Sequence, residues 1–216
     1  QRLFRAQADV RQSQLTRPSF LVTGAASGLG RYLHEKWGGA AITRETSAVD
    51  WAAFERTGTK TIIHCAASSA KDMDQSALYS YLSDSIFLTQ RVVRIPHEKL
   101  IYISSVDVYP KNGRTHREDE TIALDEIQGL YGLCKLSSEA VILRETGQPL
   151  ILRASTLLGS ASRKNSLIRM AEDSDCRLSL SADSPINCVR HADVADLIAL
   201  ALERGNQCFV NDLGWS

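Results

Sequence analysis

Short apolar runs alternate with amphipathic segments along almost the whole chain. Consecutive apolar residues predict buried strands, and apolar residues three or four positions apart predict helices. Strands are expected at 20–23, 40–43, 60–67, 99–105, 150–155 and 208–210, and helices at 31–37, 75–94, 131–145 and 193–202. Right-handed crossovers then place helices on both faces of one parallel sheet. The predicted fold class is α/β, with a doubly wound parallel sheet.

The first apolar run ends in three glycines and leads directly into the first helix. Gly24, Gly28 and Gly30 follow the strand that starts at Phe20. Glycine lets the backbone bend and approach a pyrophosphate, and the free N–H groups of a helix N-terminus neutralise its charge. This is the context of the Rossmann dinucleotide-binding turn. Ordinary turns carry such glycines too, so the interpretation depends on residues further along the chain.

An arginine closes the second predicted strand. Arg44 lies 20 positions after Gly24 and is followed by Glu45. An acidic residue at this place binds the ribose 2′-hydroxyl of NAD, whereas an arginine pairs with the 2′-phosphate of NADP. We therefore predict NADP as the cofactor and keep NAD as the alternative. The alternative is that Arg44 is an exposed arginine in a loop and has no role in cofactor binding.

Three polar residues in the middle of the chain form a candidate catalytic set. Tyr131 and Lys135 lie one helical turn apart on one face, and Ser105 ends a central strand. An ammonium close to a phenol lowers the pKa of the phenol toward neutrality, which suits a general acid or base. Ser105 can position the substrate oxygen. Together with the glycine turn, the trio predicts hydride transfer between a nicotinamide and a carbonyl or carbinol carbon.

Composition limits the other classes of function. The 216 residues carry zero formal net charge, so no broad basic surface for nucleic acid or an anionic membrane is expected. No apolar run is long enough to span a membrane and no signal peptide is recognisable, from which we expect a soluble cytoplasmic protein. The five cysteines stand singly, which argues against a zinc site or a disulfide framework. We interpret them as reduced and mostly buried, and we predict no metal site.

A few further polar residues receive mainly structural interpretations. His64, inside an apolar run, is expected to be a core histidine, and Asp193 is expected to cap the last helix. Arg153 either reaches a phosphate or pairs with a neighbouring carboxylate. The acidic stretch 118–120 is expected to be a solvated surface, while Arg190 and His191 precede a helix near the expected substrate cleft.

The chain resembles the short-chain dehydrogenase/reductase superfamily, and within it the extended branch of nucleotide-sugar epimerases, dehydratases and reductases. The motifs that carry the resemblance occur in the family's order from residue 20 to about 214. They are TGAASGLG (23–30), HCAA (64–67), ISSVDVYP (103–110), YGLCK (131–135) with Glu139 after it, LRASTLLG (152–159) and INCVRHADVADLIALAL (186–202).

The resemblance implies roles for individual residues. Ser105, Tyr131 and Lys135 would be catalytic, and Lys135 would also hold the nicotinamide ribose. The implied cofactor contacts are Thr23, Gly24, Ala26, Ser27, Gly28, Leu29 and Gly30 at the pyrophosphate, Asp50 and Trp51 near the adenine, and Ala66, Ala67, Ser68, Ile103 and Ser155 along the cleft. Substrate contacts are expected at Ser105, Asp107, Thr156 and Arg190.

The resemblance also implies an activity. The segment around Arg44 and the motif LRASTLLG are similar to those of NADPH-using reductases, including dTDP-4-dehydrorhamnose reductases. We expect a reductase that acts on a nucleotide-linked sugar or a similar carbonyl compound. An epimerase or dehydratase that retains NAD, and a non-catalytic dinucleotide-sensing protein, remain alternatives. A homodimer is expected to form through the helices at 75–94 and 131–145.

Two departures from the family pattern qualify the expected domains. The glycine spacing G-x-x-x-G-x-G is that of classical members, and extended members continue well beyond the length of this chain. We therefore expect a short or truncated C-terminal substrate subdomain. The predicted organisation is an N-terminal extension at 1–17 and a dinucleotide-binding domain at 18–216, with a partial substrate-binding region around 156–190.

Overall fold

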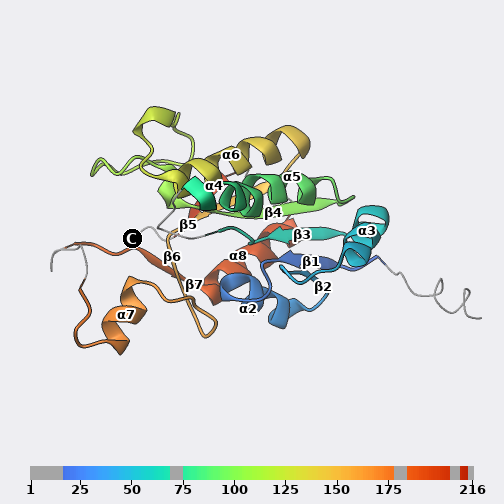
Figure 1. The fold of residues 1–216 in the computed structure, drawn as a ribbon, viewed down its shortest axis with the longest axis horizontal. Helices are drawn as coiled ribbons and strands as arrows, with labels where there is room; N and C mark the ends of the chain where they lie inside the picture. Colours follow the sequence, from blue (N-terminus) through green and yellow to red (C-terminus); the bar gives the residue numbers. More distant parts are fainter. Residues whose placement is uncertain (1–16, 69–74, 178–183, 205–209, 214–216) are drawn as a thin grey trace, which may run out of the picture.

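A parallel six-stranded sheet forms the centre of the protein (Figure 1). The computed structural model describes residues 17–68, 75–177, 184–204 and 210–213. The strand order is β2-β1-β3-β4-β5-β8. The strands are β1 (Phe20–Thr23), β2 (Ala40–Ile42), β3 (Thr61–His64), β4 (Lys99–Ser105), β5 (Leu150–Ala154) and β8 (Val210–Leu213). The strand order reverses between β1 and β3, and such a switch point is where open α/β sheets bind ligands.

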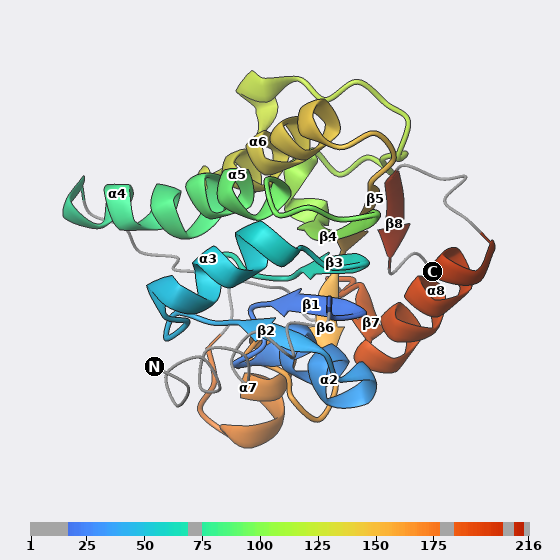
Figure 2. The ribbon, with the colours of Figure 1, turned by 90° about the vertical axis from the view of Figure 1, so that its right-hand side faces the viewer.

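Helices cover both faces of this sheet (Figure 2). One face is covered by α2 (Gly28–Trp37) and α8 (His191–Arg204), and the other by α3 (Ala48–Thr57), α5 (Leu88–Val93) and α6 (Leu130–Glu145). Alternate strand residues explain the two layers, because successive side chains of a strand point to opposite faces. Val22 and Ile63 pack toward α2 and α8, whereas Leu21 and Ile62 pack toward α3 and α5. The predicted fold class is confirmed.

The predicted helix at 75–94 contains a π-helical turn. It consists of α4 (Gln75–Leu82), the π turn Ser83–Phe87 and α5. A π turn inserts an extra residue into the helix, and such turns are frequent at functional sites. Here the turn brings Asp84 to the end of the sheet where β1, β2 and β3 finish.

A small second unit lies within the predicted substrate-binding region around 156–190. β6 (Thr156–Leu158) pairs in parallel with β7 (Cys188–Arg190), and α7 (Ser166–Glu172) lies between them in the chain. The loop from β6 to α7 returns toward the first turn of α2, because Arg163 donates a hydrogen bond to Ser27. The unit therefore borders the carboxyl end of the main sheet.

Some local predictions need correction. The strand predicted at 60–67 ends at His64, and α2 begins at Gly28 rather than Arg31. Asp193 lies in the first turn of α8, which already begins at His191, and its carboxylate accepts hydrogen bonds from Arg190 instead of capping the helix. The last strand begins at Val210, while positions 208 and 209 and the extension at 1–16 lie outside the described residues.

The cysteines are less buried than predicted. Of the four that the structure describes, Cys134 is buried, Cys65 and Cys176 are half-buried, and Cys188 is exposed; all four are free thiols. Cys208 lies outside the described residues. Within the described ranges no group of histidine, cysteine and carboxylate side chains is arranged to hold a metal ion. No helix among the described residues has the length and apolar character needed to cross a membrane.

Candidate active site

Two neighbouring cavities open at the carboxyl end of the sheet. The first, of about 670 Å³, is lined by the ends of β1 and β2, by α3 and by the π turn. The second, of about 390 Å³, is lined by the start of α2, the ends of β4 and β5, and α6. Ser27, Ala67 and Arg163 line both cavities. Together the cavities form one elongated cleft across the switch point of the sheet.

The glycine turn lies where the two cavities meet, and its backbone leaves no room for larger side chains. A Cβ atom on Gly24, whose φ is +71°, would lie 2.9 Å from the Ala66 nitrogen, and one on Gly30 would lie 2.5 Å from the Gly24 oxygen. The first turn of α2 carries no acidic residue, and Ser27 makes no side-chain cap. The helix N–H groups thus face the cleft uncapped, which fits the pyrophosphate of a dinucleotide.

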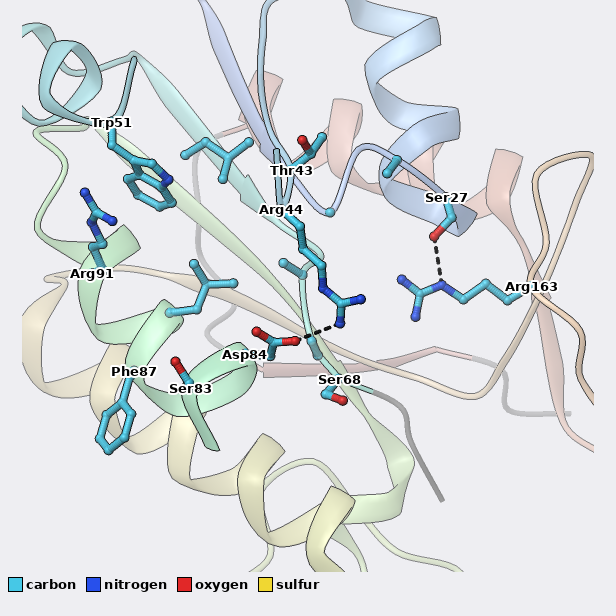
Figure 3. Close-up of a pocket in the computed structure, with 16 residues that line it drawn as sticks. Ser27, Thr43, Arg44, Trp51, Ser68, Ser83, Asp84, Phe87, Arg91 and Arg163 are labelled. Carbon is cyan, nitrogen blue, oxygen red and sulfur yellow. Dashed lines mark hydrogen bonds and ion pairs between the residues drawn. The ribbon is translucent and has the colours of Figure 1, made fainter. Parts of the chain in front are cut away.

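The first cavity gathers charged and aromatic side chains from several elements (Figure 3). Arg44 is 82% exposed at the cavity mouth, and its guanidinium lies 2.7 Å from the Asp84 carboxylate on the π turn. Trp51 of α3 lies deeper, with the Arg91 guanidinium 3.9 Å from its ring centroid. This half of the cleft offers an aromatic surface for a base and a cation for a phosphate.

The second cavity brings together the predicted catalytic residues. Ser105, Tyr131 and Lys135 all line it. Lys135 is buried, and its Nζ donates a 2.7 Å hydrogen bond to the Ile103 carbonyl oxygen. Burial lowers the pKa of Lys135 to about 8. The same Nζ lies 5.9 Å from the centroid of the Tyr131 ring.

The pKa of Tyr131 departs from the prediction. Burial of the phenol raises its pKa, the Asp107 carboxylate raises it further, and hydrogen bonding with Ser105 opposes the shift. The predicted lowering toward neutrality is therefore wrong for this structure. Loss of hydration disfavours the phenolate, the Arg163 guanidinium opposes the shift, and the Lys135 ammonium donates its hydrogen bond to the Ile103 carbonyl oxygen. Tyr131 consequently remains protonated at neutral pH.

Asp107 lies beside Ser105. Its carboxylate accepts a hydrogen bond of 3.2 Å from Ser105 Oγ, and the backbone N–H of Asp107 donates to the same hydroxyl oxygen. Lys111 pairs with the carboxylate at 3.1 Å. The carboxylate is therefore held close to Ser105, although Asp107 is not among the residues that line either cavity.

Most of the remaining predicted residues line the cleft. The first cavity includes Ala26, Ala66 and Ser68, and the second includes Leu29, Ile103, Ser155 and Thr156. The Ser155 hydroxyl is buried and has no hydrogen-bond partner among the described residues. Because an unpaired buried hydroxyl is costly, this atom fits a polar group of a bound ligand.

Three predicted contact residues lie elsewhere. Thr23 is buried beneath the turn, where its Oγ1 accepts a hydrogen bond from the Ala66 N–H and contacts His64 Nδ1 at 2.6 Å. Asp50 belongs to the start of α3, where its N–H donates to Ser47 Oγ. Arg190 forms an exposed ion pair with Asp193. The two lining sets contain none of the three.

His64 and Arg153 are buried in hydrogen-bond networks. His64 lies between Thr23 and Thr89 Oγ1, and burial lowers its pKa to about 3. Arg153 forms a buried ion pair of 2.8 Å with Glu139. Of the two predicted roles of Arg153, the structure therefore supports pairing with a neighbouring carboxylate rather than contact with a phosphate.

Two residues of the cleft were not predicted from the sequence. Asp84 comes from the π turn, and Arg163 comes from the loop between β6 and α7. Neither lies in a motif that marks cofactor binding, so only the three-dimensional arrangement reveals them. His191 also lines the second cavity, as a buried side chain whose ring nitrogens have no hydrogen-bond partner among the described residues.

Solved structures with the same fold include nucleotide-sugar enzymes. A dTDP-4-dehydrorhamnose reductase from Bacillus anthracis, in complex with NADP, matches with a TM-score of 0.74 and 19% identity, over 93% of this chain and 75% of that chain. A UDP-glucuronic acid 4-epimerase from Bacillus cereus, in complex with UDP-glucuronic acid and NAD, matches with a TM-score of 0.72 and 20% identity, over 91% and 77%. At these identities the likeness establishes the fold.

Sequence comparison assigns the family. A search of curated protein sequences found no significant match. The model of the NAD dependent epimerase/dehydratase family matches residues 20–210, which include the glycine turn, both cavities and the predicted catalytic residues. The chain belongs to the NAD dependent epimerase/dehydratase family.

Proposed function

We propose that this protein is an NADP(H)-dependent oxidoreductase that acts on a nucleotide-linked sugar or a similar carbonyl compound. The observation that carries the proposal is the division of the cleft into a half with an exposed arginine, Arg44, and a half with Ser105, Tyr131 and Lys135. Arg44 suits the 2′-phosphate that distinguishes NADP from NAD. NAD remains the alternative cofactor.

The residues of the second cavity fit a reduction. When bound, the nicotinamide supplies the hydride in that direction. Tyr131, whose pKa is raised by burial, holds its proton at neutral pH and can donate it to the substrate oxygen. Ser105 donates a hydrogen bond to the same oxygen once its hydroxyl turns from Asp107. The Lys135 ammonium, close to the Tyr131 ring, stabilises the phenolate that remains.

The proposal is tested by measuring NADPH oxidation with a panel of nucleotide-linked keto-sugars. We expect turnover with at least one of them, and we expect the rate to depend on Tyr131. Tight NADPH binding without turnover of any keto-sugar would favour the non-catalytic alternative. Absence of dinucleotide binding would refute the proposal.

A second candidate is an epimerase or dehydratase that keeps NAD bound through each cycle. Its support is membership of a family that includes such enzymes, and the Asp107 carboxylate beside Ser105 as a further acid–base group. The test is the mass of any small molecule that remains with the protein after purification. A retained NAD would favour this candidate, whereas an exchangeable NADP(H) would favour the reductase.

We also propose that the protein forms a homodimer through α4, the π turn and α6. Large apolar side chains are exposed on these elements, namely Leu78, Tyr79, Phe87 and Leu143. Burying such side chains against a second copy is favourable. Light scattering coupled to size exclusion tests the proposal, and a monomer at all concentrations would contradict it.

A further inference from the structure

Arg163 occupies the junction between the two cavities of the cleft. It lies in the loop between β6 and α7, distant in sequence from the glycine turn, and it is one of the residues that line both cavities. A dinucleotide carries its pyrophosphate between its two nucleosides. If the nucleosides occupy the two cavities, as the proposed function requires, the pyrophosphate lies beside Arg163.

The contacts of Arg163 place it over the glycine turn. Its Nε donates a 3.0 Å hydrogen bond to Ser27 Oγ, the residue just before α2. Its side chain crosses the open face of Gly28, where an added Cβ would lie 3.6 Å from both Cγ and Nε of Arg163. The distance of 3.6 Å is an ordinary van der Waals contact, so the Arg163 side chain lies directly against the start of α2.

The guanidinium faces the interior of the cleft. Figure 3 shows the Arg163 side chain beside Ser27 and extending toward Arg44, whose own guanidinium points to Asp84. The first cavity is lined by three arginines, Arg44, Arg91 and Arg163, against one carboxylate, Asp84. Arg91 also pairs with Glu55. This charge pattern suits a ligand with phosphate groups at two separate places.

We propose that Arg163 is a ligand of the cofactor pyrophosphate and binds it beside the first turn of α2. The planar guanidinium can donate two parallel hydrogen bonds to phosphate oxygens. Since Arg163 lies in the loop that leads to α7, the bound cofactor then holds this loop over the glycine turn. The cofactor thereby links the main sheet to the region between β6 and β7, where the substrate is expected.

The test compares ligands with and without the pyrophosphate. Binding of NADP⁺ and of adenosine 2′-monophosphate is measured by titration calorimetry for the wild type, Arg163→Gln and Arg163→Lys. We expect Arg163→Gln to weaken NADP⁺ binding about 10- to 100-fold, the effect of losing hydrogen bonds to a charged group. Binding of adenosine 2′-monophosphate, which lacks the pyrophosphate, stays within about twofold. Arg163→Lys retains part of the affinity because it keeps the charge without the planar fork.

Arg169→Gln is the matched control. Arg169 is exposed on α7, close in sequence to Arg163, and lines neither cavity. Its replacement changes the net charge equally and is expected to leave NADP⁺ binding within about twofold. The melting temperatures of all variants are compared with that of the wild type, because Arg163 is exposed and its loss should not affect folding.

The outcomes separate this inference from the proposed function. If the wild type binds NADP⁺ and Arg163→Gln binds it equally well, the inference is wrong and the proposed function stands. An equal loss of NADP⁺ and adenosine 2′-monophosphate binding would also overturn it, since Arg163 would then act on the adenosine half. If the wild type binds neither NADP⁺ nor NAD⁺, the proposed function itself fails.

Discussion

The two halves of the cleft differ in how they hold their charged groups. Arg44 in the first half is 82% exposed and pairs with a carboxylate at the surface. Lys135 in the second half is 5% exposed and donates to a buried carbonyl. Exposed ion pairs contribute little to stability, whereas a buried charge depends on its surroundings. Substitutions in the first half should therefore affect ligand affinity alone, and those in the second half should affect turnover or stability.

The largest effect is expected for Tyr131, the proposed proton donor. Tyr131→Phe removes the hydroxyl and keeps the ring, so turnover should fall by about 10²- to 10⁴-fold, the usual contribution of general acid catalysis. NADPH affinity should stay within a few-fold. Steady-state rates and fluorescence titration measure the two effects separately. Unchanged turnover in this variant would refute the assigned role of Tyr131.

The buried ion pair beside the second cavity should carry the largest effect on stability. Arg153 and Glu139 lie 2.8 Å apart and are both buried. Glu139→Gln leaves the arginine charge buried without its partner, and the free energy of unfolding should fall by about 3–5 kcal/mol. Urea denaturation measures the change. The control Asp193→Asn breaks the exposed pair with Arg190 and should leave the free energy of unfolding nearly unchanged. Equal losses of stability in the two variants would contradict the expected difference between buried and exposed ion pairs.

Lys135 should give the second half a distinctive pH dependence. Burial lowers its pKa to about 8, so turnover should decline as pH rises above about 8 and the ammonium loses its proton. In the unfolded chain the pKa of Lys135 returns to its ordinary value near 10.4. Between about pH 8 and pH 10 the unfolded state therefore binds more protons than the folded state, and the contribution of Lys135 to stability becomes more favourable as the pH rises. Rate profiles test the first statement, and denaturation of the wild type and Lys135→Met tests the second. Rates that stay flat to pH 10 would contradict the lowered pKa.

In the first half, Arg44→Ala should affect one cofactor only. NADP⁺ binding should weaken by about 1.5–3 kcal/mol, the value of a hydrogen bond to a charged group, and NAD⁺ binding should stay within about twofold. Arg56→Ala, an exposed residue of α3 outside both cavities, is the control. Titration calorimetry with both cofactors measures the preference. Equal losses for NADP⁺ and NAD⁺ would show that Arg44 does not read the 2′-phosphate.

The smallest effect is expected for the partner of Arg44. Asp84→Asn removes a carboxylate that a 2′-phosphate would have to displace from Arg44. Exposed pairs contribute about 0–1 kcal/mol, so NADP⁺ affinity should rise by up to about fivefold. NAD⁺ affinity should not change. A loss of NADP⁺ affinity would mean that Asp84 positions Arg44 instead of competing for it.

Much of the fold followed from the hydrophobic pattern. The strand at 99–105 has the predicted bounds, because its apolar run is continuous and ends where the cleft begins. The strand predicted at 60–67 was too long, since Cys65, Ala66 and Ala67 look apolar in sequence and yet lie in an irregular segment against the glycine turn. The π turn was not predicted, because its five residues show no hydrophobic periodicity that differs from the helical spacing of α4 and α5 on either side.

The part of the site that a single local motif forms, the glycine turn, was predictable from the sequence. Gly24 and Gly30 required a close backbone approach, and the structure contains it; at Gly28 the structure instead requires a positive φ of +60°. The pKa of Tyr131 was not predictable, because burial and the charge of Asp107 come from the tertiary structure. Arg163 reaches the cleft from more than a hundred positions beyond the turn, so no spacing in the sequence could reveal it.

A crystal structure of the protein with NADP⁺ is the decisive measurement. We expect the 2′-phosphate against Arg44, the pyrophosphate against both the first turn of α2 and Arg163, and the nicotinamide between Tyr131 and Ser155. A dinucleotide bound outside the two cavities, or one with its adenosine beside Tyr131, would contradict this arrangement.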